Sequence, residues 1–200
     1  SRDNQRCIVK FSPPRGTPFG ERWHALLQLE HLALTVLSKH GIASAASQII
    51  QTPTRSYLQS ARFDRLPDHS MRHVVAIDAL HDEFVGGPRQ HWVHSSQALH
   101  AKGLITEQEL QHIATIHAFG HFIGNTDMHF GNLSFFVDDI IKPKISLAPV
   151  YDMLPMMWRP DGFHGLSDSP VRQQRLPTDF AAAQAQARKW ATEFWERAAQ

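Results

Sequence analysis

The chain has 200 residues, of which 42% are hydrophobic and 20% are charged, and its formal net charge is +1. This length and composition suit one folded domain, or a domain with part of another, and the balanced charge does not by itself indicate nucleic-acid or membrane binding. The single cysteine, Cys7, excludes an internal disulfide, and no apolar run reaches the ~18 residues of a membrane-spanning helix. We therefore expect a soluble, cytoplasmic protein.

The first part of the chain predicts a small β-rich unit crossed by one helix. Residues 6–11 have the pattern of a strand, and a loop rich in proline and glycine follows them. Apolar residues between Leu26 and Leu37 recur at helical spacing, so we expect a helix over residues 21–40 that ends at Gly41. Further short strands of this unit are predicted at 47–51, 57–63 and 73–77.

The remainder of the chain predicts mainly helix. Thr106 and Glu109 have the spacing of a capping box, so a helix is expected to run from there to about Gly124. Residues 158–177 lack periodicity and predict a loop. A final alanine-rich helix is expected from Thr178, with its aromatic residues in the core: Phe180, Trp190, Phe194 and Trp195.

The most informative motif lies between the two helical regions. Asp127 and Asn132 have the spacing Asp-x-x-x-x-Asn, and Asp152 follows two apolar strands predicted at 133–137 and 145–150. A hairpin of these strands would bring the three side chains together. Phosphoryl transfer from a metal-bound nucleotide uses such a set, in which one Asp faces the incoming hydroxyl and an Asn and a second Asp bind Mg²⁺. The alternative is that Asp127 and Asn132 only form hydrogen bonds to the backbone of an ordinary turn.

Two further residues of this loop have open roles. His129 either supplies a positive group near the transferred phosphoryl, or orients Asp127, or only satisfies the loop backbone. Gly131 is expected to allow a tight turn or a close approach to a phosphate.

Candidate nucleotide-binding residues lie in the β-rich unit. Lys10 ends the first predicted strand, where a kinase-type lysine would reach the phosphates of ATP, and Glu30 on the next helix would steer it. The alternative is that both side chains are simply exposed. In ARFDR, residues 61–65, the backbone of Ala61, Arg62 and Phe63 would bind adenine as a hinge.

In the same segment, Asp64 would bind the ribose hydroxyls. Alternatively, Arg62, Asp64 and Arg65 form an ordinary surface ion network.

At this point the sequence resembles a known family. NTDMHFGNLSFF followed by LAPVYDM resembles the signature of the HipA-like serine/threonine kinases, toxins of bacterial toxin–antitoxin pairs, in which Thr-Asp-x-His-x-Lys-Asn-x-Ser precedes Pro-x-Tyr-Asp. CIVKF resembles the nucleotide-lysine strand of that family, LEHLALTVLSKHGI its first helix and ARFDR its hinge. The resemblance covers most of the chain up to about Met157.

The resemblance implies an α+β, two-lobed protein-kinase-like fold. Residues 1–75 would form part of the small N-lobe with the hinge, and residues 76–200 a mostly helical C-lobe with the catalytic and metal-binding loops. ATP and Mg²⁺ are the implied cofactors. The implied partners are a protein substrate, in the best-known case from the translation machinery, and a HipB-type DNA-binding antitoxin, with DNA contacted indirectly or through upstream residues.

Residue by residue, the resemblance makes Asp127 the catalytic base and Asn132 and Asp152 the Mg²⁺ ligands. It makes Lys10 the contact to the ATP phosphates and residues 61–64 the adenine and ribose hinge.

Two departures from the family pattern matter. Gly131 stands where the family has a lysine, so a positive charge near the phosphoryl group is missing. No glycine-rich phosphate loop precedes Lys10, so we expect that loop upstream of Ser1 in a longer protein. Two alternatives therefore stay open: a catalytically weak kinase-like module that binds an antitoxin or DNA, and a metal-dependent phosphoesterase or nuclease that uses Asp127, His129 and Asp152.

Overall fold

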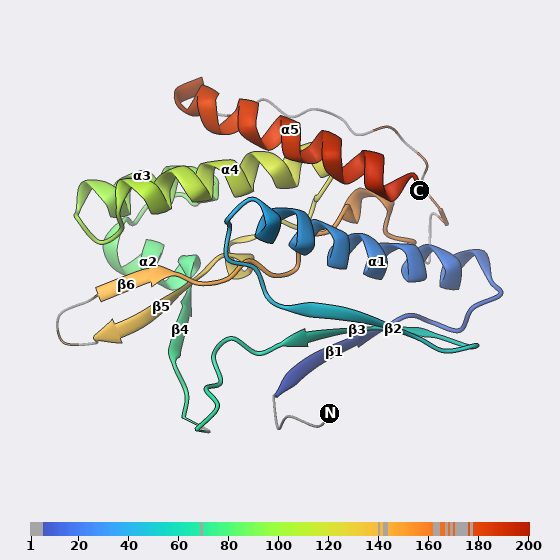
Figure 1. The fold of residues 1–200 in the computed structure, drawn as a ribbon. Coiled ribbons are helices and arrows are strands. Elements are labelled where there is room, and N and C mark those ends of the chain that lie inside the picture. The colour runs from blue at the N-terminus through green and yellow to red at the C-terminus, as the bar shows by residue number, and fades with distance from the viewer. Residues whose placement is uncertain are drawn as a thin grey trace.

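The computed structural model describes residues 6–68, 70–139, 141, 144–161, 165, 166, 168, 170, 176 and 178–200. In these parts of the chain the structure has two three-stranded antiparallel sheets and five α-helices (Figure 1). None of the described helices is long and apolar enough to cross a membrane.

The first sheet, with one helix beside it, makes up the small lobe. Its strands are β1 (Cys7–Phe11), β2 (Ser47–Gln51) and β3 (Ser56–Ala61), in the order β1-β3-β2, and α1 (Pro18–Lys39) packs against them (Figure 1). The helix begins with Thr17, whose hydroxyl accepts a hydrogen bond from Gly20 N at 3.0 Å, and with a proline at its first position, where no N–H is needed. The three strands and the helix predicted here from the sequence are confirmed.

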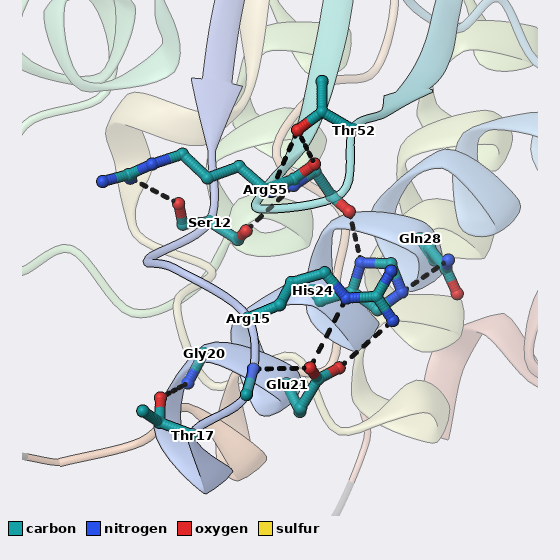
Figure 2. A network of polar contacts seen from close by, with 11 residues as sticks. Ser12, Arg15, Thr17, Gly20, Glu21, His24, Gln28, Thr52 and Arg55 are labelled. Carbon is teal, nitrogen blue, oxygen red and sulfur yellow. Dashed lines mark hydrogen bonds and ion pairs between the residues drawn. The ribbon is translucent and has the colours of Figure 1, made fainter.

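A polar network fixes the connection from β1 to α1 (Figure 2). Ser12 is fully buried, and its hydroxyl accepts from Ser56 N at 3.1 Å while its carbonyl accepts from Arg55 Nη1 at 2.8 Å. His24 on α1 contacts the hydroxyl of Ser56 through Nδ1. Since buried polar groups are costly unless paired, these contacts hold β1 and α1 in one relative position.

The second sheet has the order β4-β5-β6 and consists of β4 (His73–Ala76), β5 (Ser134–Asp139) and β6 (Lys144–Leu147). The predicted hairpin is confirmed as β5 and β6. The sequence predicts strand 73–77 for the β-rich unit, and the structure corrects this, because the strand pairs with β5. Its apolar residues gain buried partners there, as in the pair Val75 and Phe135. The predicted boundary between the N-lobe and the C-lobe, after residue 75, falls within β4 and stays a prediction.

The large lobe is mostly helical, with α2 (Ile77–Phe84), α3 (Trp92–Ala101), α4 (Glu107–Ile123) and α5 (Ala181–Ala198). The capping box at α4 is confirmed: Glu109 N donates to Thr106 Oγ1 at 3.2 Å, and Thr106 N donates to Glu109 Oε2 at 2.8 Å. Helix α4 ends at Gly124, whose φ of 79° suits glycine. Helices α4 and α5 pack side by side (Figure 1), and three of the four aromatic residues expected in the core are buried: Phe180, Trp190 and Phe194.

Helices α2 and α3 are not predicted from the sequence. Helix α2 has only eight residues and no side-chain N-cap, and α3 mixes polar and apolar residues without a clear stripe. Both helices are held by packing, with Ile77 and Trp92 almost completely buried. Local sequence signals are weak in such cases because tertiary contacts, and not propensity, stabilise the helix.

Contacts of Glu193 join α5 to the end of α1 and make stability depend on pH. Hydrogen bonds at 2.8 Å from Lys39 and from His40 lower the pKa of Glu193 to about 2. A lowered pKa in the folded state stabilises the protein above the ordinary glutamate pKa of 4.5, and this contribution disappears as pH falls toward 2.

We expect Glu193→Gln to lower the free energy of unfolding at pH 7 by ~0.2–1 kcal/mol in urea titrations. The difference from wild type should shrink steadily between pH 4.5 and 2. Glu196→Gln, on the exposed side of the same helix, is the control. A difference between wild type and Glu193→Gln that persisted unchanged at pH 2 would contradict this assignment.

Candidate active site

The loop between α4 and β5 carries Asp127 and Asn132. A short 3₁₀ turn at Phe130–Asn132 folds the loop back, so that Asn132 Nδ2 donates to the carbonyl of Asp127 at 2.8 Å. Asn132 is only 8% exposed, whereas Asp127 is exposed. The amide of Asn132 therefore ties the loop together through its nitrogen and keeps its oxygen for another ligand.

His129 caps the same turn. Its Nδ1 accepts a hydrogen bond from Gly131 N at 3.1 Å, and Trp92 Nε1 donates to its carbonyl at 3.0 Å. The interpretation in which His129 satisfies the loop backbone is thus confirmed, and its catalytic role stays a prediction. A Cβ at position 131 would lie 3.0 Å from the His129 ring, so a glycine there leaves room for the ring.

Asp152 follows β6 and has a special backbone conformation. Its φ of 53° is the only positive φ of a non-glycine residue in the described parts of the chain. Such a conformation costs free energy and persists only where surrounding contacts hold it, which is common in functional sites.

Asn125 joins Asp152 to the catalytic loop. It is 4% exposed, its Nδ2 donates to the carbonyl of Asp152 at 3.4 Å, and its Oδ1 accepts from Asp127 N at 3.0 Å. One buried amide thus holds the backbone of both predicted functional aspartates. Asn125 is not among the residues predicted from the sequence, although its place two positions before Asp127 and directly after the end of α4 could have indicated it.

Tyr151 makes a second connection between the same segments. Its hydroxyl donates to the carbonyl of Gly131 at 2.7 Å and lies 2.7 Å from the hydroxyl of Ser134. Burial raises the pKa of Tyr151 above its ordinary value, so the phenol stays protonated and able to donate. Asn125 and Tyr151 thus connect the loop that carries Asp127 and Asn132 to the Asp152 segment by hydrogen bonds.

Lys10 lies between two carboxylates. Its Nζ donates to Glu30 Oε1 at 2.7 Å and Oε2 at 3.0 Å, and it also contacts Asp152 Oδ1. Burial alone would lower the pKa of Lys10, but the two carboxylates raise it above its ordinary value. Burial raises the pKa of Glu30, which Lys10 partly offsets. The predicted pairing of Lys10 with Glu30 is present, and neither side chain is fully exposed.

The predicted nucleotide-binding residues line a cavity of about 320 Å³ between the two lobes. Apolar side chains supply part of its wall, and the charged residues that line it are Lys10, Glu30, Arg62, Asp64 and Asp152. All six residues proposed from the sequence for the nucleotide, together with Asp152, line it: Lys10, Glu30, Ala61, Arg62, Phe63 and Asp64. Asp127, His129 and Asn132 do not.

The hinge differs from its predicted form in detail. Ala61 N already donates to the carbonyl of Ala46 at 2.7 Å, and Arg62 N to the carbonyl of Arg6 at 2.9 Å. These two N–H groups are therefore engaged within the small lobe, which leaves that of Phe63 as the expected adenine donor.

The ion network that was the alternative for Asp64 is also present. Arg62 binds its carboxylate at 2.9 and 2.5 Å, and Arg65 lies 3.5 Å away. The Arg62 hydrogen bonds lower the pKa of Asp64. Binding of ribose by Asp64 stays a prediction.

The residues expected to hold Mg²⁺ suit that ion in their chemistry. Among the described residues, no three His, Cys, Asp or Glu side chains are arranged to hold a metal together. Mg²⁺ needs fewer protein ligands than this, because it keeps several waters and binds through one or two carboxylates and substrate phosphates. The oxygen of Asn132 and the carboxylate of Asp152 are oxygen donors of the required kind, and Asn125 and Tyr151 fix their segments.

We expect Asn125→Ala to lower kcat for phosphoryl transfer by ~10–100-fold, because Asp127 and Asp152 lose the amide that positions them. Steady-state kinetics on the full-length protein should show the loss in kcat together with a rise in KM for ATP, since Asp152 lines the nucleotide cavity and loses a contact that holds its backbone. Gln111→Ala, on the exposed face of α4, is the matched control. Unchanged kcat in Asn125→Ala would remove the residue from the active site.

Comparison with known proteins shows the family and the fold of this chain. The family model of the HipA-like C-terminal domain matches residues 1–200. Toxin YjjJ of Escherichia coli (strain K12) is 33% identical over 197 residues, which is 98% of this chain and 44% of that protein. The chain thus spans less than half the length of this curated relative.

Two solved structures share the fold. The HipA, HipB and operator DNA complex of Shewanella oneidensis MR-1 matches with a TM-score of 0.59 and 16% identity, over 96% of this chain and 58% of the other. The Helicobacter pylori proinflammatory kinase CtkA matches with a TM-score of 0.57 and 15% identity, over 76% and 53%. These matches confirm the predicted kinase-like α+β fold. Because the family match takes in every residue, the chain belongs to the HipA-like C-terminal domain family.

Proposed function

We propose that this chain is the catalytic part of an ATP- and Mg²⁺-dependent kinase that phosphorylates a serine or threonine hydroxyl of a protein, as a HipA-like toxin. The observation that carries the proposal is the contact of Lys10 with both Glu30 and Asp152 at the wall of one cavity. Lysine, glutamate and metal-binding aspartate are the groups that protein kinases place around the nucleotide phosphates.

In the proposed reaction, Lys10 binds the phosphates, and Phe63 N–H binds adenine between the apolar walls of the cavity. Asp127 accepts the proton of the substrate hydroxyl while that oxygen forms a bond to the γ-phosphorus and the bond to the ADP oxygen breaks. Bound Mg²⁺ would neutralise phosphate charge, held by Asn132 and Asp152. Lys10 contacts Asp152 Oδ1, so Mg²⁺ held by that carboxylate would compete with this contact.

The missing lysine at position 131 affects this proposal. With Gly131 in its place, the loop brings no ammonium group to the transferred phosphoryl, and we expect a lower rate than in a relative that has the lysine. Because this positive charge is absent, the competing function is that of a catalytically weak module that acts by binding.

The phosphate-covering loop is proposed to come from the longer protein. β1 is an edge strand of its sheet, and Ile8, Val9 and Phe11 on it are 51–63% exposed. Among the described residues β1 has one neighbouring strand, β3, and an edge strand with exposed apolar residues suits pairing with a further strand, next to Lys10 and the nucleotide cavity.

The partners are proposed by analogy with the relatives. One of the matching structures is a complex of HipA with HipB and operator DNA. We propose that the full-length protein likewise binds a HipB-type antitoxin, that it contacts DNA through that partner or its own upstream residues, and that its substrate belongs to the translation machinery.

Calorimetry of ATP binding, with and without Mg²⁺, tests the proposal on the full-length protein and on this chain. We expect Mg²⁺-dependent binding at full length, with weaker binding by the chain alone if the upstream loop completes the site. No binding by either protein would contradict the kinase proposal and favour the binding role. Metal binding and phosphodiester hydrolysis without a need for ATP would favour the phosphoesterase.

A further inference from the structure

The exposed side chain of Asp127 faces space outside the nucleotide cavity. It lines two other cavities, of about 650 and 440 Å³, whereas the nucleotide cavity contains Asp152 and not Asp127. If Asp127 is the base, the substrate hydroxyl must arrive through one of these two spaces. The larger one is bounded by the catalytic loop, the end of α4 and the start of α3.

Three of the four histidines that line the larger cavity are linked by ring contacts. His117 and His121, one turn apart on α4, have ring centroids 4.5 Å apart, and their Nε2 atoms are 3.3 Å apart. His91 lies 5.4 Å from His117 by ring centroids, and its Nδ1 accepts from His94 N at the start of α3. A substrate that brings its hydroxyl to Asp127 through this cavity would therefore contact imidazole rings.

These imidazoles are held uncharged. Burial lowers the pKa of His117 to about 3, with help from His121 and His91, and burial also lowers the pKa of His121 and of His91. In a neutral pair joined through Nε2, one ring donates and the other accepts. The donating ring then has a lone pair on Nδ1, which can accept a hydrogen bond from a substrate.

The described residues that line the cavity carry negative charge only. Among the described residues that line it, Asp127 is the only acid, and there is no lysine or arginine. An acidic side chain placed there would face the carboxylate of Asp127 without a counter-charge, whereas an ammonium or guanidinium group would be attracted to it and could donate to imidazole nitrogen.

We propose that this histidine-lined cavity binds the polypeptide segment next to the acceptor hydroxyl, and that it selects lysine or arginine and rejects aspartate and glutamate there. The inference rests on the proposed kinase function and adds the substrate class to it. His121 is then a specificity-determining residue.

The test uses the full-length protein with Mg²⁺-ATP and a peptide library in which each position flanking a serine or threonine is lysine, arginine, alanine or glutamate. Wild type should favour a basic over an acidic residue by at least ~10-fold in kcat/KM at one flanking position. His121→Lys, which adds a positive charge to the wall, should remove or reverse that preference, and the neutral His121→Gln should retain it. His112→Lys, on the same helix but outside the cavity, is the control.

An acidic preference in wild type, or equal profiles for His121→Lys and His112→Lys, would overturn the inference. Wild type that binds Mg²⁺-ATP but phosphorylates no peptide would also count against the cavity as a polypeptide site. Failure to bind Mg²⁺-ATP would instead contradict the proposed function itself. Thermal unfolding of each variant separates loss of selectivity from loss of folding.

Discussion

Asp127→Asn in the full-length protein is expected to lower the rate of phosphoryl transfer by ~10²–10⁴-fold, the usual contribution of a general base. Asparagine has the same shape but cannot take the proton of the substrate hydroxyl. The backbone of the loop should not change, because the hydrogen bonds of Asn125 and Asn132 go to the N–H and carbonyl of Asp127 and not to its carboxylate. Single-turnover transfer of labelled phosphate measures the effect.

ATP affinity separates this result from a folding defect. Asp127 does not line the nucleotide cavity, so Asp127→Asn should bind Mg²⁺-ATP as wild type does. Asp82→Asn, on the exposed face of α2, is the control for an aspartate lost elsewhere. Full activity in Asp127→Asn would show that another group is the base.

Asp152→Asn is expected to abolish the Mg²⁺-dependent part of ATP binding, and phosphoryl transfer with it. An amide is a weaker ligand than a carboxylate for a hard cation such as Mg²⁺. Asparagine also tolerates positive φ, so the backbone at 53° should persist, whereas Asp152→Ala would add strain to the loss of the ligand. Calorimetry at several Mg²⁺ concentrations measures the effect.

The affinity of Asp152→Asn for ATP without Mg²⁺ provides a second test. Asp152→Asn removes one of the two carboxylates that hold Lys10, and Lys10 keeps Glu30. ATP binding without Mg²⁺ should therefore stay equal or rise, because Lys10 is freer to contact phosphate. Asp138→Asn, at the end of β5 and outside the three cavities near the site, is the control. Mg²⁺-dependent binding that survived in Asp152→Asn would place the metal elsewhere.

The sequence alone predicted the elements that have strong local signals. A capping box marks the start of α4 and a glycine marks its end, and alternation and turn residues mark β1 to β3. The spacing of Asp127 and Asn132 predicts a loop, which one hydrogen bond between these two residues closes. These features depend on contacts between residues close in the chain, so their pattern is visible in one sequence. The pairing of Lys10 with Glu30 is also predicted, because the motif of Asp127, Asn132 and Asp152 indicates a nucleotide site that needs such a pair.

Only the tertiary structure decided the features made by contacts distant in the chain. It paired β4 with β5 and engaged the N–H groups of Ala61 and Arg62 within the small lobe. It also placed Asn125 between two aspartates and gathered His91, the N-cap of α3, and two histidines of α4 around one cavity. Such partners are chosen by packing and by the need to pair every buried polar group, and a single sequence records neither choice.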